Sequence, residues 1–145
     1  MIRSFSPKDL DTIMRIWLEG NLDAHPFISP DYWISRIPLV REQLPLAKIL
    51  VWESEETVLA FAGMQGEYLA GIFVDRSFRS RGIGGELFRQ LKSCYPSFHL
   101  NVYEKNEAAV RFYLKEGLQT TARNQDADTG EMELTMKWSS EQRRD

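Results

Sequence analysis

The stretch Arg79-Ser80-Arg81-Gly82-Ile83-Gly84 constrains the fold more than any other part of the sequence. An apolar run typical of a strand, Leu69–Val74, precedes it, and a run typical of a helix, Glu86–Leu91, follows it. Glycine lets a backbone approach a phosphate group closely, and the first turn of a helix offers unpaired N–H groups at the positive end of its dipole. A strand, a basic glycine-rich turn and a helix in this order predict a site for a small molecule that carries phosphate groups.

Two other phosphate-binding loops fit this stretch less well. The P-loop of nucleotide-binding proteins ends in Gly-Lys followed by Ser or Thr, whereas Gly84 is followed by Gly85 and Glu86. The dinucleotide-binding fingerprint needs a third glycine, and Leu87 stands there, although Glu104 lies where the ribose-binding acid of that fingerprint belongs. A plain helix start after a flexible turn is the remaining alternative, and the arginines crowded there disfavour it.

The spacing Arg79-x-x-Gly82-x-Gly84 resembles the acyl-CoA pyrophosphate loop of the GNAT superfamily of N-acetyltransferases. A second run, Asn106–Leu118, resembles the N-x-x-A-x-x-F-Y-x-x-x-G-F segment of that family, with a leucine in place of the usual final aromatic residue. A strand-like run, Phe98–Val102, separates the two motifs, which together span about half of the chain. The resemblance implies an N-acetyltransferase that uses acetyl-CoA as its acetyl donor.

Composition bounds the remaining possibilities. A chain of 145 residues is long enough for one domain with a core. Its net charge of −3 argues against nucleic-acid binding, and the absence of a run of about 18 apolar residues argues against a membrane helix. The single cysteine, Cys94, and an N-terminus without an apolar signal core predict a cytoplasmic protein, and no metal-ligand spacing is present.

Apolar periodicity predicts an α/β fold in one domain, residues 1–145, with a frayed tail over 139–145. The first helix begins after Ser6-Pro7 and is broken at Asn21–Phe27; the second begins at Ser29-Pro30-Asp31 and is kinked or restarted at Pro38. The predicted strands are Met1–Phe5, Ile49–Glu53, Val58–Gln65, Tyr68–Val74, Phe98–Val102 and a final hairpin of Leu118–Arg123 with Glu131–Trp138. A helix between two strands implies a parallel pair. This order of strands and helices is the one that the GNAT fold uses, so the resemblance implies a GNAT-like mixed, mostly antiparallel sheet with a central parallel strand pair, flanked by helices.

The resemblance implies a set of donor-binding residues. Ligands of such sheets lie at the carboxyl ends of parallel strands. In the family the two parallel strands splay apart, and the pantetheine arm of acetyl-CoA lies in the gap. The residues that this implies are Ile72, Phe73 and Val74 through their backbone, Arg79, Ser80, Arg81, Gly82, Ile83, Gly84 and Gly85 around the phosphates, and Asn106 and Tyr113 at the arm.

Transfer by direct attack of an amine on acetyl-CoA needs a base for the ammonium and an acid for the departing thiolate. Tyr113 matches the acid position of the family, although its apolar helix face also suits a core residue. Several members carry the base five residues before the conserved asparagine, where this chain has Asn101. Glu67, before the third strand, stands at a second family location for a base, and a solvated turn residue is its alternative role. Water-mediated transfer with Tyr103 or Glu104 is also open.

The acceptor side is expected in the loop between the first two helices. The family resemblance implies that His25 and Phe27 line it, together with Asn101 and Tyr103, whereas a packing role for His25 is equally compatible with the sequence. The sequence does not identify the acceptor amine, which can be a small-molecule amine, a protein lysine or a protein N-terminus. A non-catalytic acyl-CoA-binding module on the same fold is the alternative, and monomer and homodimer are both open.

Overall fold

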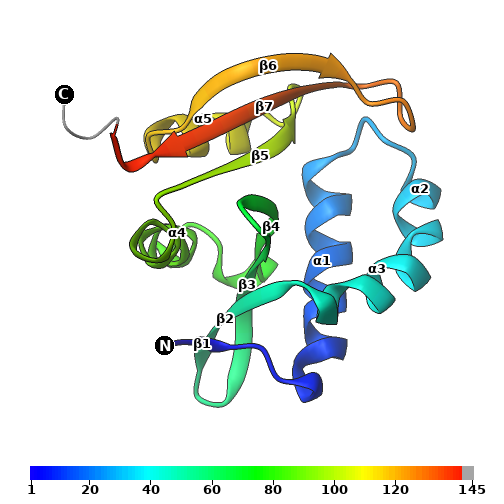
Figure 1. The fold of residues 1–145 in the computed structure, drawn as a ribbon. Coiled ribbons are helices and arrows are strands. Elements are labelled where there is room, and N and C mark those ends of the chain that lie inside the picture. The colour runs from blue at the N-terminus through cyan, green and yellow to red at the C-terminus, as the bar shows by residue number, and fades with distance from the viewer. Residues whose placement is uncertain (142–145) are drawn as a thin grey trace.

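A computed structural model describes residues 1–141, and Figure 1 shows their arrangement. The strands are β1 (Ile2–Ser4), β2 (Lys48–Ser54), β3 (Thr57–Gln65), β4 (Tyr68–Val74), β5 (Ser97–Tyr103), β6 (Gln119–Gln125) and β7 (Met132–Ser139). The α-helices are α1 (Leu10–Ala24), α2 (Pro30–Ser35), α3 (Ile37–Gln43), α4 (Ile83–Cys94) and α5 (Glu107–Lys115), and short 3-10 turns lie at Pro7–Asp9, Leu44–Leu46 and Arg76–Phe78.

The seven strands form one sheet in the order β1-β2-β3-β4-β5-β7-β6. Every neighbouring pair is antiparallel except β4 and β5, which are parallel. The predicted mixed sheet with a central parallel pair is therefore confirmed. Those two strands share one register pair, Tyr68 with His99, next to a bond of 2.9 Å from the His99 N–H to the Glu67 carbonyl. Beyond that point the facing edges of β4 and β5 are not paired with each other.

Helices cover both faces of the sheet. Figure 1 shows α1, α2 and α3 on one side and α4 and α5 on the other. On the α1 side, Ile13 and Ile16 pack against Val51 and Phe61 of the sheet. These apolar side chains recur at helical spacing in α1 and alternate along the strands, which is why each element buries one face.

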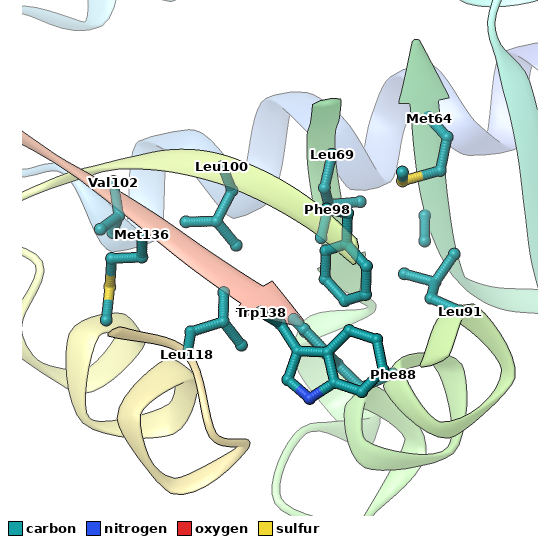
Figure 2. Packing of buried hydrophobic residues seen from close by; sticks show 11 residues of the cluster. Met64, Leu69, Phe88, Leu91, Phe98, Leu100, Val102, Leu118, Met136 and Trp138 are labelled. Atoms are coloured by element: carbon teal, nitrogen blue, oxygen red, sulfur yellow. The ribbon is translucent and has the colours of Figure 1, made fainter. Parts of the chain in front are cut away.

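The main core lies under α4 and α5. Figure 2 shows Phe88 and Leu91 of α4 pointing toward Phe98 of β5 and Trp138 of β7. The rings of Phe88 and Phe98 lie 5.8 Å apart, and those of Phe98 and Trp138 lie 5.4 Å apart. This packing joins the helix after the glycine-rich turn to the strands on the far side of the parallel pair, so it fixes the position of the turn.

Two local expectations change. Helix α1 runs on to Ala24 instead of breaking at Asn21, because the buried Asn21 side chain donates back to the Trp17 carbonyl at 3.0 Å. The predicted restart at Pro38 is confirmed, since α2 and α3 are separate helices that meet at Arg36.

The frayed tail does not begin at residue 139. Ser139 pairs with Ser97 as the last residue of β7, and the Ser140 N–H donates to the Pro96 carbonyl at 2.9 Å. The rest of that prediction, residues 142–145, lies outside the described residues. The single-domain assignment stays a prediction.

Candidate functional site

A cavity of about 720 Å³ opens where β4 and β5 part. Its walls come from the C-terminal part of α1, from Ala70–Val74 of β4, from the end of β5 and from the start of α5. The predicted site residues that line it are Ile72, Phe73, Val74, Arg79, Asn106 and Tyr113 from the donor set and His25, Asn101 and Tyr103 from the acceptor set. Nine residues that were predicted to contact either the donor or the acceptor thus line the same cavity.

The glycine-rich turn forms the N-terminus of α4. Gly82 adopts a left-handed backbone with φ +84°, which a side chain would strain, and Ser80 is also left-handed at φ +64°. The first helical bond runs from the Glu86 N–H to the Gly82 carbonyl at 3.0 Å. The N–H groups of Ile83, Gly84 and Gly85 precede that bond, so they are the donors that an anion can use.

Most of this turn lies beside the cavity and not in it. Arg81, Gly82 and Ile83 line a separate hollow of about 490 Å³, together with Trp52 and Arg89. The guanidinium of Arg81 lies 5.0 Å from the centre of the Phe78 ring. Ser80, Gly84 and Gly85 line neither space.

Arg79 reaches the cavity, but its charge is paired. It donates to the Val74 carbonyl and to the Asp23 carboxylate, both at 3.2 Å, and Arg76 donates to the same carboxylate at 2.9 and 3.0 Å. Burial alone would raise the pKa of Asp23, but the hydrogen bonds from the two arginines hold it below its usual value. A bound phosphate would therefore compete with Asp23 for Arg79.

Tyr113 lies on the side of α5 that faces α4. Its ring is 5.8 Å from that of Phe88, and the side chain also lines the cavity. Burial raises the pKa of its hydroxyl to about 12, because surrounding protein desolvates the phenolate. The hydroxyl therefore keeps its proton at neutral pH, as a proton donor must.

Asn106 caps α5 and contacts His25. Its Oδ1 accepts the Ala109 N–H at 3.3 Å, so Nδ2 is the atom that faces His25 Nε2 at 3.4 Å. Because Nδ2 is a donor, Nε2 of His25 must be the acceptor, and the ring proton is on Nδ1.

His25 lies in an aromatic cluster. Its ring stacks on Trp33 at 5.1 Å and meets the edges of Phe27 and Tyr103 at 5.7 and 5.1 Å. Burial lowers the pKa of His25 to about 4, although the Asn21 carbonyl opposes the shift, so the ring is neutral at physiological pH. Phe27 supports this cluster without lining the cavity.

Glu67, the predicted base, lies outside the cavity at the amino end of β4, where its exposed carboxylate accepts a bond of 3.0 Å from the Ser97 hydroxyl. It belongs to the β3–β4 turn and does not line the cavity, although its neighbour Tyr68 does. Asn101 does line the cavity, but an amide cannot take up the proton, and its Oδ1 accepts from the Thr135 hydroxyl at 2.8 Å.

Sequence reasoning missed Tyr68, Asp126 and Glu133, all of which line the cavity. The Tyr103 hydroxyl donates to Asp126 at 2.6 Å, and Glu133 is the register partner of Tyr103 across β5 and β7. The alternation of β7 indicates that Glu133 shares a face with Thr135, but the pairing of β7 with β5 is a long-range fact that this pattern does not contain.

The match to a family model decides the relationship. Residues 10–118 match the model described as the acetyltransferase (GNAT) family. The chain belongs to the GNAT acetyltransferase family. The family resemblance is thereby confirmed, and the chain is an N-acetyltransferase that uses acetyl-CoA.

Relatives and solved structures agree with this assignment. The chain is 40% identical over 119 residues to peptidyl-lysine N-acetyltransferase YiaC of Escherichia coli, which covers 81% of this chain and 82% of that protein. It is 32% identical over 130 residues to peptidyl-lysine N-acetyltransferase YjaB of the same species, with 89% and 88% covered.

The solution structure of apo-form YjaB from Escherichia coli superposes with a TM-score of 0.85 at 29% identity, over 95% of this chain and 96% of that one. A GCN5-related N-acetyltransferase structure from Rhodopseudomonas palustris shares the fold with a TM-score of 0.82 at 16% identity, over 96% and 94% of the two chains. Among residues 1–141, no helix combines the length and the apolar character that a bilayer crossing requires.

Proposed function

We propose that this enzyme acetylates the ε-amino group of lysine in proteins or peptides. The observation that carries the proposal is the division of the cavity. Arg79 lies beside the carboxyl end of β4, where it donates to the Val74 carbonyl, whereas Asp126 and Glu133 form an acidic end beside Tyr103 at the carboxyl end of β5. A cationic lysine suits the acidic end, and the names of the relatives YiaC and YjaB point to the same acceptor.

The unpaired edge of β4 supports the donor site. Residues Gly71–Val74 pair with β3 on one edge, whereas their other edge faces the gap to β5. Backbone N–H and C=O groups on that edge need partners, and the amides of a pantetheine arm supply them. One such N–H would polarise the thioester carbonyl, an effect worth roughly 3–4 kcal/mol in enzymes that use it.

The phosphates belong at the start of α4 in this proposal. The free N–H groups of Ile83–Gly85 would surround the pyrophosphate, with Arg81 beside them and Arg79 released from Asp23. Asn106 would bind the arm from the opposite side, since its position is fixed by the cap of α5. Arg79 links the turn to the cavity, because it lines the cavity and donates to the Val74 carbonyl.

Catalysis follows as a direct transfer in a ternary complex. The neutral lysine nitrogen forms a bond to the acetyl carbon while the carbon–sulfur bond breaks, and Tyr113 donates its hydroxyl proton to the departing sulfur. The proton that the newly formed amide nitrogen must lose then restores the Tyr113 hydroxyl. Its raised pKa and its position in the cavity support this role. General acids of this kind contribute about 10²- to 10⁴-fold to rate.

An acceptor panel tests the proposal. The enzyme is mixed with acetyl-CoA and, in parallel, with a lysine peptide whose N-terminus is blocked, a lysine-free peptide with a free N-terminus, and a small diamine. We expect CoA release and an acetylated lysine in the first reaction, located by mass spectrometry. Faster acetylation of the N-terminus or of the diamine would overturn the lysine assignment. Binding of acetyl-CoA without transfer in any reaction would favour the non-catalytic module. Cytoplasmic location and the choice between monomer and homodimer stay predictions.

A further inference from the structure

The proposed reaction needs a base that the sequence motifs do not supply. A lysine side chain has an ordinary pKa of about 10.4, so it arrives as an ammonium ion and must lose a proton before it attacks. Glu67 lies outside the cavity and Asn101 is an amide. The base must therefore come from the other side chains that line the cavity.

Four carboxylates line that space: Asp23, Asp126, Asp128 and Glu133. The first three are engaged. Asp23 is bound by two arginines, and Asp128 forms an ion pair of 3.8 Å with Arg36. Burial would raise the pKa of Asp126, but the hydrogen bonds from Tyr103 and from the Asp128 N–H keep it below its usual value. A carboxylate stabilised in its charged form is a weak base.

Glu133 differs from these three. Its half-buried side chain makes no hydrogen bond and no ion pair to any of residues 1–141. Burial raises the pKa of this carboxyl, and the negative charge of Asp126 raises it further. Glu133 is thus the cavity carboxylate with the strongest tendency to take up a proton and with no group holding its oxygen atoms.

The other charged and titratable residues of the cavity leave Glu133 free to take up a proton. Besides the four carboxylates, the titratable or charged residues that line this cavity are His25, Tyr32, Arg36, Tyr68, Arg79, Tyr103 and Tyr113. Both cations are paired: Arg79 binds Asp23, and Arg36 pairs with Asp128 and lies 5.2 Å over the Tyr32 ring. The tyrosines are neutral at physiological pH, since burial raises the pKa of Tyr68 and of Tyr103.

His25 is the rival base and is less suitable. It is neutral, but its Nε2 lone pair already accepts from Asn106, and its Nδ1 carries the proton. Its pKa of about 4 also makes it a poor proton acceptor. Before Nε2 could accept a proton from lysine, the Asn106 amide would have to break its hydrogen bond to His25.

We propose that Glu133 is the general base that deprotonates the acceptor lysine. The inference rests on the proposed function. One proton passes from the lysine ammonium to a carboxylate oxygen of Glu133, and the freed nitrogen lone pair then attacks the acetyl carbon. After product release, Glu133 returns that proton to water. No other donor, acceptor or co-reactant is needed.

The pH dependence of Glu133→Gln tests the inference. Near pH 7 we expect kcat/KM for the lysine peptide to fall by about 10²- to 10⁴-fold, because only the small neutral fraction of the amine can react. The wild-type profile should show an acidic limb above the ordinary glutamate pKa of about 4.3. The variant should lack that limb and instead gain activity with pH until the lysine itself titrates, so its deficit shrinks in alkaline buffer.

Two variants serve as controls. Glu131→Gln removes a carboxylate two residues away that pairs with Lys105 at 2.9 Å outside the cavity, and it should keep the wild-type profile. Glu133→Asp keeps a carboxylate and should retain part of the activity together with an acidic limb. Thermal melting with and without acetyl-CoA shows whether each variant folds. If Glu133→Gln does not fold, Glu133→Asp still tests the role of Glu133.

The outcomes separate the two proposals. Wild-type enzyme that does not acetylate lysine removes the proposed function itself. Wild-type enzyme that does acetylate lysine, with a folded Glu133→Gln variant of unaltered rate and pH profile, leaves the function in place and overturns the role of Glu133. If only Glu133→Asp folds, an unaltered rate despite the shortened side chain overturns that role.

Discussion

The amide nitrogen of Asn106 lies 3.4 Å from Nε2 of His25, so the residue that caps α5 is bound to the residue that ends α1. This contact joins the wall predicted to hold the donor to the wall predicted to hold the acceptor. It depends on a neutral imidazole, because a protonated His25 would present an N–H to the donor group of Asn106.

The charge state of His25 gives the first prediction. Its folded-state pKa of about 4 lies below the ordinary value of 6.5, so the unfolded chain binds more protons between these two pH values. The unfolding free energy should therefore fall as pH drops from 6.5 toward 4. Denaturant unfolding of wild type and His25→Gln checks this, and the variant should lose less stability over the same interval. A His25 NMR resonance that titrates near pH 6.5 in the folded protein would contradict the account.

A charge at Gly84 should abolish donor binding. At a hundredfold excess over its dissociation constant, acetyl-CoA should stabilise the wild-type fold by about 2.7 kcal/mol. Gly84→Asp should remove this effect, since its carboxylate would occupy the phosphate site. Gly84→Ala is the matched control, because its Cβ would meet only the Phe112 ring, with Cζ at 3.4 Å and Cε1 at 3.9 Å, and adds no charge. Equal melting shifts in both variants would move the phosphate site elsewhere.

Replacing the Tyr113 hydroxyl should slow the chemical step alone. Tyr113→Phe keeps the ring and its packing on Phe88, so stability and acetyl-CoA affinity should change little. Turnover with a saturating lysine peptide should fall by about 10²- to 10⁴-fold. Single-turnover measurement shows whether chemistry limits the rate. An unchanged single-turnover rate in Tyr113→Phe would show that Tyr113 only packs in the core and does not donate the proton.

The local structure around the cavity was predictable from adjacent residues. The sequence predicted a helix directly after the glycine-rich turn, where α4 begins, and the apolar pattern of Tyr68–Val74 matches β4 from end to end. Glu133 was not predictable in this way. It reaches the cavity because β7 inserts between β5 and β6, a strand order that is set by packing of the whole sheet.

The location of Glu67 also depends on the folded sheet. Its position in the sequence matches a family location for the base, yet the β3–β4 turn holds it at the amino end of β4, where Ser97 binds it. The helix break predicted at Asn21 was wrong because the side chain of Asn21 is buried in the folded protein. A solvent-exposed polar side chain ends a helix more readily than the buried Asn21, which donates a hydrogen bond to the Trp17 carbonyl of the same helix.

A buried ion pair far from the cavity gives a stability prediction. Arg3 binds the buried Asp9 through two bonds of 2.8 and 3.0 Å and also contacts Glu53 at 2.8 Å. Arg3→Met would leave the Asp9 carboxylate buried without its partner, which costs about 3 kcal/mol. Arg15→Met is the control, because its pairs are exposed and should be worth less than about 1 kcal/mol. Urea unfolding measures both.

The same pair should respond to acid. The hydrogen bond from Arg3 lowers the pKa of Asp9, so this stabilisation is complete above the unfolded-state pKa of about 3.9 and is lost as pH falls through the lower folded value. Wild type should therefore lose its advantage over Arg3→Met in strong acid. If the difference in unfolding free energy between wild type and Arg3→Met stayed constant down to low pH, the ion pair would not be the source of that difference.

The gap between β4 and β5 carries the whole functional account, and a crystal structure of the acetyl-CoA complex tests it most directly. The account predicts the pantetheine arm along the free edge of Gly71–Val74, the pyrophosphate at the N–H groups of Ile83–Gly85, and the acetyl group in the cavity that Tyr113 and Glu133 line. Acetyl-CoA bound instead in the hollow beside Trp52 and Arg89, with β4 and β5 unoccupied, would contradict it.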